Sequence, residues 1–137
     1  MSGKTYTIEI VTPRKVVFSG EAVSFTAPGE LGSFQVLSGH APLLAAIGIG
    51  ELKLRDASGT ETHYATSGGS VEVLANRVVV LAESAERSDQ VDIQRAERAR
   101  ERAEERLKRR AEEIDFGRAK SSLMRALNRL RVARGGA

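Results

Sequence analysis

The sequence predicts a two-domain chain, with β-structure over residues 1–87 and an antiparallel helical hairpin over residues 88–137. In the first part, short apolar stretches are separated by turns rich in Gly and Pro, which is typical of a β-sandwich or flattened barrel. In the second part, apolar residues recur at spacings of three and four without any Pro, as on one face of an α-helix. Charge divides at the same place: residues 1–87 carry 7 basic and 9 acidic side chains, and residues 88–137 carry 14 basic and 9 acidic ones.

The first part is expected to fold as a succession of short strands. Thr12–Arg14 is expected to form a turn, Ser19–Gly20 to end a short strand, and Pro28–Gly32 to form a tight loop in which Gly supplies left-handed backbone conformations. Residues 83–87 are expected to lead into the helices. The predicted strands cover residues 5–11, 16–18, 21–27, 33–37, 43–47, 49–55, 61–66, 71–74 and 78–82.

Two helices are expected in the second part. The first should begin between Asp89 and Asp92, where an acidic first turn suits the helix dipole, and should run to about Glu113. Asp115 would cap the second helix, and Gly135–Gly136 would end it. Each helix carries a thin apolar stripe, and the two stripes are expected to pack together. The stripe residues are Ala96, Ala99, Ala103, Leu107, Ala111 and Ile114 in the first helix, and Ala119, Leu123, Ala126, Leu127, Leu130 and Ala133 in the second.

Arginines form a ridge beside each stripe. At roughly 100° per residue, an antiparallel arrangement brings both ridges to the same side of the hairpin, whereas a parallel arrangement would separate them. The planar guanidinium group donates two hydrogen bonds to two phosphate oxygens, so such a groove suits a phosphate-bearing ligand, although a solvated basic face is the simpler interpretation. The ridge residues are Arg95, Arg98, Arg102, Arg106 and Arg109 in the first helix, and Arg118, Arg125 and Arg129 in the second.

The alanine-rich stripes also predict a weakly held hairpin. Burial contributes about 0.8 kcal/mol per CH₂, so an alanine stripe holds two helices together far less firmly than a leucine stripe. The pattern therefore predicts a hairpin that can open or detach from a partner.

Several classes of protein are excluded or disfavoured. The chain has no cysteine, which excludes disulfides and thiolate metal sites, and it has no apolar run long enough for a transmembrane helix or a secretory signal. His40 and His63 lie far apart in sequence, and no Ser-His-Asp arrangement, P-loop or His-rich spacing is present, so we expect neither a catalytic nor a metal site.

A nucleic-acid-binding adaptor that uses the basic hairpin is the alternative from another class. The hairpin lacks aromatic residues interleaved with its basic ones, which stacking on single strands would require, and its many glutamates argue against a polyanion clamp, so we expect no nucleic-acid partner. This alternative predicts binding that falls steeply with salt and is indifferent to free ATP.

Five motifs, in order along the chain, carry a resemblance to a known family. They are Gly29-Glu30-Leu31-Gly32, Gly39-His40-Ala41-Pro42-Leu43, Ser67-Gly68-Gly69, Val71-Glu72-Val73 and Val80-Leu81-Ala82-Glu83, followed by the charged two-helix tail. Together they strongly resemble the epsilon subunit of bacterial F-type ATP synthase over essentially the whole chain.

The resemblance implies a β-sandwich of about ten strands, a C-terminal helical hairpin and a non-catalytic role in the central stalk. It implies contacts of residues 1–87 with the gamma subunit and the ring of c subunits, and contacts of the extended hairpin with the alpha/beta catalytic head. In the family, the extended hairpin inhibits ATP hydrolysis and the folded hairpin permits activity. The implied location is the cytoplasmic face of the bacterial inner membrane, as a peripheral membrane protein.

In some members of that family the folded hairpin binds ATP, and the signature is similar to Val91–Ala96 here. The resemblance therefore implies ATP as a regulatory ligand and no required cofactor. Val91 replaces a longer apolar residue, which would weaken the contact with adenine modestly; Asp92 would accept a hydrogen bond from the adenine amino group, and the arginines would bind the phosphates. The implied ATP-binding residues are Glu86, Val91, Asp92, Arg95, Ala96, Arg102, Arg125 and Arg129.

The resemblance also implies that Glu30, Leu31 and His40 contact the c ring. Relatives usually have three residues between the Gly-Glu-Leu-Gly and Gly-His-Ala-Pro motifs, often ending in Pro, whereas this chain has the six residues Ser33–Ser38 and no Pro. The loop that faces the ring is therefore expected to differ in shape.

Overall fold

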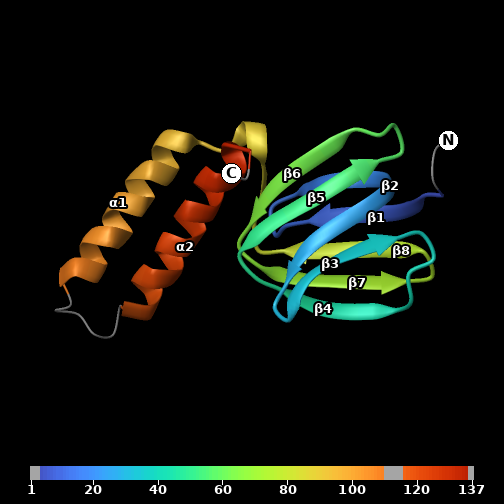
Figure 1. Cartoon of the computed structure of the whole chain (residues 1–137), viewed down its shortest axis with the longest axis horizontal. Coiled ribbons are helices and arrows are strands. Elements are labelled where there is room, and N and C mark those ends of the chain that lie inside the picture. Colours follow the sequence, from blue (N-terminus) through green and yellow to red (C-terminus); the bar gives the residue numbers. More distant parts are fainter. Residues whose placement is uncertain (1–3, 110–115, 136–137) are drawn as a thin grey trace.

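A computed structural model describes residues 4–109 and 116–135, which form a β-sandwich with a helical hairpin at one end (Figure 1). The two-part architecture predicted from the sequence is confirmed. The nine strands of the described residues are β1 (Tyr6–Val11), β2 (Val16–Gly29), β3 (Gly32–Leu37), β4 (Leu43–Ile47), β5 (Gly50–Asp56), β6 (Glu61–Thr66), β7 (Gly69–Leu74), β8 (Arg77–Ala82) and β9 (Ala85–Arg87).

Strand β2 corrects one prediction, because Ser19–Gly20 does not end a strand. Gly20 pairs with Ile8 inside the antiparallel β1–β2 ladder, and β2 then continues along β5, with a register irregularity between Ala22 and Ser24. The strand therefore turns at that point from one layer of the sandwich into the other, as Figure 1 shows. The two strands predicted at residues 16–18 and 21–27 are the two arms of this one strand.

Each layer of the sandwich contains one arm of β2. The first arm lies beside β1, which is followed by β8, β7 and β4; β1 and β8 run parallel, and the other pairs are antiparallel. The second arm lies between β3 and β5, and β6 and β9 follow. Strand β9 lies in the segment expected only to lead into the helices. Its pairing with β6 fixes where the chain leaves the sandwich.

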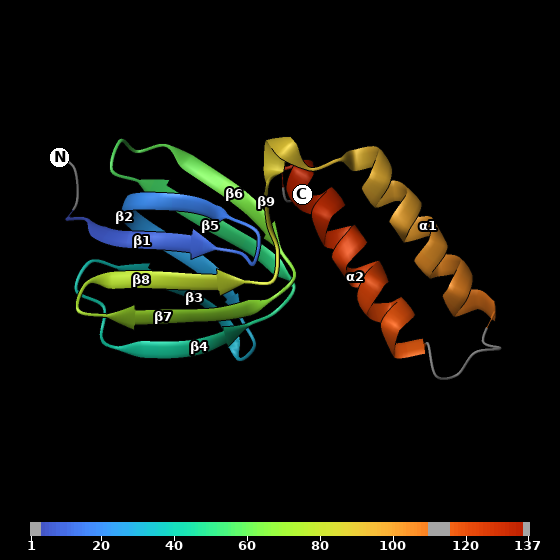
Figure 2. The ribbon, with the colours of Figure 1, turned by 180° about the vertical axis from the view of Figure 1, so that it is seen from behind.

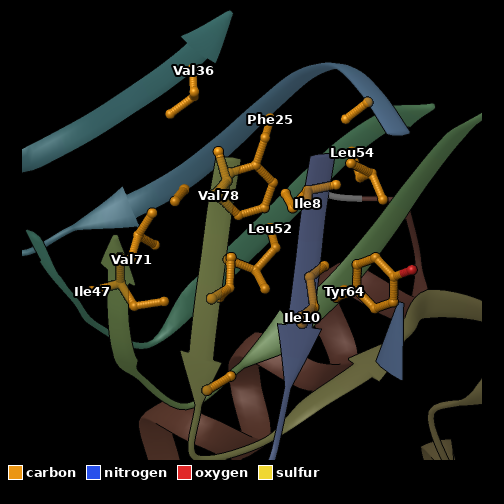
Figure 3. Close-up of a cluster of buried hydrophobic side chains, with 14 of the residues drawn as sticks. Ile8, Ile10, Phe25, Val36, Ile47, Leu52, Leu54, Tyr64, Val71 and Val78 are labelled. Atoms are coloured by element: carbon orange, nitrogen blue, oxygen red, sulfur yellow. The ribbon is translucent and has the colours of Figure 1, made fainter. Parts of the chain in front are cut away.

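The core lies between the two layers and consists of every second residue along the strands, those that face inward (Figure 3). Phe25 is fully buried near the middle, and Tyr6 is buried with its hydroxyl donating a 2.7 Å hydrogen bond to the carbonyl oxygen of Val36. The largest fully buried aliphatic side chains of the sandwich are Ile8, Ile10, Val36, Leu52, Leu54, Val71, Val73, Val78 and Val80. This core gives the sandwich a framework of its own, to which the hairpin is attached.

The β2–β3 connection is a tight turn at Glu30–Leu31, as predicted for this motif. The residues that lengthen this region lie in the strand rather than in the turn, because β3 keeps an unbroken register with β2 from Gly32 to Leu37. Gly29 is required here, since a Cβ atom would lie 2.5 Å from the carbonyl oxygen of Gly32.

Helix α1 (Ile93–Arg109) and helix α2 (Phe116–Ala133) form the hairpin. A short 3₁₀ turn, η1 (Ser88–Gln90), precedes α1, so the first helix begins at the end of the predicted interval. Asp92 caps α1, because its Oδ1 accepts a 3.0 Å hydrogen bond from the backbone N–H of Arg95. The predicted end of the first helix at Glu113 and the predicted cap Asp115 lie outside the described residues.

The helices pack through small side chains. Ala96 and Ala103 of α1 and Ala119 and Ala126 of α2 are buried, which confirms the predicted alanine interface. Leu127 is an exception: it was placed on the stripe, but it is 46% exposed. In the same half of α2, Ala126 and Leu130 are buried as the predicted stripe requires. Val132, which was not placed on the stripe, is buried as well, because this part of the helix packs against the sandwich as well as against α1.

One buried polar side chain joins α2 to the sandwich. The Asn128 side-chain amide donates a 2.8 Å hydrogen bond to the carbonyl oxygen of Gly50 and a 3.4 Å hydrogen bond to that of Thr66. Its Oδ1 accepts a hydrogen bond from Arg131, so both ends of the amide are satisfied. Asn128 therefore fixes the hairpin at the end of the sandwich where β5 begins and β6 ends, the side on which Figure 2 shows the hairpin.

We expect Asn128→Ala to loosen the hairpin without unfolding the sandwich. The substitution leaves two carbonyl oxygens without their donor, which costs about 1–3 kcal/mol, and α2 amides should then exchange with solvent roughly tenfold faster or more. Leu127→Ala removes an exposed side chain from the preceding position and is the control. Unchanged α2 exchange in Asn128→Ala would contradict this role for the amide.

Candidate functional site

An open pocket of about 600 Å³ lies between the end of the sandwich and the hairpin. Three segments build it: the β1–β2 turn, the chain on either side of the start of β9, and the facing surfaces of α1 and α2. Its lining residues are Thr12, Pro13, Arg14, Lys15, Glu83, Ser84, Ala85, Glu86, Asp92, Arg95, Ala96, Ala99, Arg102 and Arg129.

The pocket gathers six of the eight residues predicted to bind ATP: Glu86, Asp92, Arg95, Ala96, Arg102 and Arg129. Val91 is not among the lining residues; it is half-buried in the extended segment that links η1 to α1. Arg125 lies elsewhere too, and its guanidinium group donates a 3.2 Å hydrogen bond to the hydroxyl of Ser122.

A second open pocket, of about 760 Å³, is lined by Arg106 of α1 and by Arg118 and Arg125 of α2, together with Gly117, Ser121 and Ser122. Arg106 follows Arg102 by one helical turn, and Arg125 precedes Arg129 by one turn, so the two pockets follow one another along the hairpin. The two predicted ridges therefore border the same side of an antiparallel pair, as the helix geometry required. Arg98 and Arg109 line neither pocket.

The arginines of the first pocket differ in their partners. Arg129 forms an ion pair with Glu86, which links α2 directly to strand β9. No ion pair within residues 4–109 and 116–135 involves Arg95 or Arg102. These two guanidinium groups are exposed, so they can receive an anion without first losing a carboxylate.

Glu97 connects the two helices beside the pocket. It accepts a 2.8 Å hydrogen bond from Arg100 of the same helix and a 3.2 Å hydrogen bond from Arg134, just beyond the end of α2. The hydrogen bond from Arg100, followed by that from Arg134, holds the pKa of Glu97 below its usual range. The same pairing raises the pKa of Arg100.

Sequence reasoning missed the sandwich side of the pocket. Thr12–Arg14 was expected only to form a turn, and residues 83–87 only to lead into the helices, yet Thr12–Lys15 and Glu83–Glu86 line the pocket beside the hairpin. Two adjacent cations, Arg14 and Lys15, within a turn were the available signal. Asn128 was missed as well, although it lies one helical turn before the buried Val132.

The three residues predicted to contact a c ring do not lie together. Glu30 and Leu31 form the β2–β3 turn, where Leu31 is fully exposed. His40 follows the other end of β3, so a six-residue strand, roughly 20 Å long, separates it from that turn. The backbone N–H of His40 donates to Leu37, and the ring Nδ1 lies 2.6 Å from the carbonyl oxygen of Ala41.

The residues that line the first pocket suit the binding of a charged ligand. Its lining offers guanidinium and ammonium groups, three carboxylates and small side chains. Within the described ranges, no three His, Cys, Asp or Glu residues cluster in a way that could hold a metal ion. Nor does either described helix have the length and apolar composition needed to cross a membrane.

Two family models match this combination of a β-sandwich and a basic helical hairpin, and they define its class. The model described as "ATP synthase, Delta/Epsilon chain, beta-sandwich domain" matches residues 5–88, and that described as "ATP synthase, Delta/Epsilon chain, long alpha-helix domain" matches residues 89–134. The chain belongs to the ATP synthase epsilon-chain family, as the motifs in its sequence indicated.

Relatives named ATP synthase epsilon chain match over nearly their whole length. The one from Desulforamulus reducens is 46% identical, with 95% of this chain and 98% of the relative covered. The one from Nitratidesulfovibrio vulgaris strain DP4 is 48% identical, with 94% and 96% covered. The one from Syntrophomonas wolfei is 42% identical, with 97% of each chain covered.

Solved structures share the fold at low sequence identity. A chain of the Euglena gracilis mitochondrial ATP synthase, solved as OSCP/F1/c-ring, aligns with a TM-score of 0.78 at 17% identity and covers 90% of this chain and 78% of its own. A chain of the Tetrahymena thermophila central stalk and c ring aligns with a TM-score of 0.55 at 22% identity, covering 67% and 73%.

We expect Glu97→Gln to weaken the hairpin at neutral pH only. A carboxylate whose pKa is depressed on folding contributes stability above its unfolded pKa, and that contribution is lost as pH falls through the folded pKa. The melting temperature of the hairpin should therefore be lower in the variant at pH 7, and the two proteins should converge as the pH falls through the depressed pKa of Glu97. Glu101→Gln, on the same helix, is the control; a difference that persisted at a pH where Glu97 is fully protonated would rule out the charge as its cause.

Proposed function

We propose that the chain is a non-catalytic subunit of the central stalk of a proton-translocating F-type ATP synthase, where it couples the catalytic head to the c ring. Membership of the epsilon-chain family supports this proposal. Solved structural neighbours of the same fold belong to assemblies named for F1, the central stalk and the c ring. Such a subunit would lie on the cytoplasmic face of a bacterial inner membrane, held there through its partners.

The sandwich offers two apolar surfaces that suit these partners. Leu31 is fully exposed at the β2–β3 turn beside Glu30. A projecting apolar side chain of this kind suits contact with the loops of the c ring. On the outer face of the first layer, Leu44 is 75% exposed and Leu81 55% exposed. We assign this second surface to the gamma subunit and the turn to the c ring; His40, at the far end of β3, would make its own contact with the ring, separate from that of the turn.

The hairpin would regulate the ATP synthase by changing its position relative to the sandwich. Its interface consists largely of alanines, and one side chain, Asn128, supplies the buried polar link to the sandwich in the described residues. In the folded position the hairpin leaves the catalytic head free. In an extended position it would reach the alpha/beta head and inhibit ATP hydrolysis.

ATP would bind the folded hairpin as a regulatory ligand. The observation that carries this part is the single pocket that gathers Glu86, Asp92, Arg95, Ala96, Arg102 and Arg129. Asp92 uses one carboxylate oxygen to cap α1, which leaves the other to accept a hydrogen bond from an adenine amino group. The arginine side of the pocket continues toward Arg125, so the phosphates would lie along Arg102, Arg125 and Arg129. A ligand that binds only the folded state stabilises it by mass action.

We expect calorimetric titration of the protein with ATP to show saturable one-to-one binding. Arg102→Ala should weaken that binding at least tenfold, because a charged hydrogen bond contributes about 1.5–3 kcal/mol. Arg98→Ala, on the same helix but outside both pockets, is the control. Equal affinities for the two variants would show that the pocket is not the ATP site.

Removal of residues 88–137 should separate the two roles. The β-sandwich has its own core, so we expect the truncated protein to fold and to assemble with the gamma subunit and the c ring. ATP hydrolysis by the assembled enzyme should then lose its inhibition. Failure of the truncated protein to join the stalk, with the sandwich folded by circular dichroism, would contradict this division of roles.

A further inference from the structure

The β1–β2 turn forms a rigid wall of the first pocket. The Thr12 backbone N–H donates a 2.9 Å hydrogen bond to the carbonyl oxygen of Lys15. The Thr12 hydroxyl lies 3.3 Å from the same carbonyl and 3.3 Å from the N–H of Lys15. These contacts close the turn on itself and hold the backbone from which Arg14 and Lys15 extend. Both side chains are exposed, and both residues line the pocket.

Without this turn, the pocket has no excess of positive charge. The remaining charged lining residues are three cations and three carboxylates, so their formal charges cancel. One of these cations, Arg129, is already paired with Glu86. The three cations are Arg95, Arg102 and Arg129, and the three carboxylates are Glu83, Glu86 and Asp92.

Arg14 and Lys15 therefore supply the whole net positive charge of the pocket. No ion pair among the residues that the structure describes involves either side chain. A ligand with several negative charges is attracted by a net positive field and gains little from a neutral one, because screening in water leaves only nearby charges effective.

We propose that Arg14 and Lys15 bind the phosphate groups of the ligand in this pocket, so that one polyphosphate anion is held by the sandwich and the hairpin together. The proposal rests on the proposed function for the identity of the ligand as a nucleoside triphosphate. Arg14 offers a planar fork to two phosphate oxygens, and Lys15 offers a mobile point charge. The turn thereby becomes half of the binding site.

A ligand that contacts both the sandwich and the hairpin links these two parts of the chain. The turn belongs to the firm sandwich, whereas Arg95 and Arg102 belong to the weakly packed hairpin. A bound anion therefore fixes the position of the hairpin relative to the sandwich, beyond holding α1 and α2 to each other. Loss of the turn cations should reduce both the affinity for the ligand and the docking of the hairpin.

The test compares the full-length protein with the double variant R14S/K15S by calorimetric titration with ATP and, separately, with inorganic tripolyphosphate. The control is K53S/R77S, which removes two exposed sandwich cations that lie outside the pocket. We expect affinity for either ligand to fall at least tenfold in R14S/K15S and less than twofold in the control. Hydrogen exchange should show ATP protecting both Thr12–Lys15 and the hairpin in the wild type, and neither segment fully in the variant.

Each result decides the proposal. If ATP binds R14S/K15S as tightly as the control, the turn cations are not part of the site, although the proposed function stands. If the wild type binds no ATP, the nucleotide assignment fails; tripolyphosphate binding that R14S/K15S loses would still establish the turn as half of an anion site. If the wild type binds neither ligand, or if tripolyphosphate binds R14S/K15S unchanged, the proposal is wrong.

Discussion

The position of the hairpin depends on one buried amide. Asn128 donates hydrogen bonds to the carbonyl oxygens of Gly50 and Thr66 at the edge of the sandwich. Burial of an amide is favourable only when its hydrogen-bond partners are in place, so this contact selects one orientation and one position of α2 relative to the sandwich. The next residue, Arg129, then extends toward Glu86 and the pocket. The docking contact and the candidate site are therefore consecutive residues of one helix, and a displacement of α2 would disturb both.

Much of the fold could be predicted from the sequence, because it follows from local patterns. Alternating apolar residues located most strands, and apolar spacing located both helices. The bend of β2 near Ala22 was missed because it is set by pairing with β1 on one side and β5 on the other, which is a property of the whole sandwich. Strand β9 was missed for a similar reason: its three residues form a strand only because the edge of β6 is available.

In the candidate site, too, some features follow from local sequence patterns and others depend on the whole fold. The shared side of the two arginine ridges followed from helix geometry, since it needs only the period of the helix and an antiparallel turn. The contribution of Arg14 and Lys15 could not be predicted in this way, because they approach the hairpin from a turn some eighty residues earlier in the chain. Leu127 was misplaced because the sandwich competes with α1 for the surface of α2, and this competition favours the burial of Asn128 and Val132.

The alanine interface has a consequence for the time course of any movement of the hairpin. An alanine side chain has no rotamers, so its burial between α1 and α2 removes no side-chain conformational entropy, and its exposure restores none. Interfaces of larger residues must find a compatible set of rotamers each time they close, whereas Ala96, Ala103, Ala119 and Ala126 meet in the same way at every encounter. Closure of α1 onto α2 therefore needs no search for compatible rotamers at these four positions, which favours rapid and repeatable closure of the hairpin.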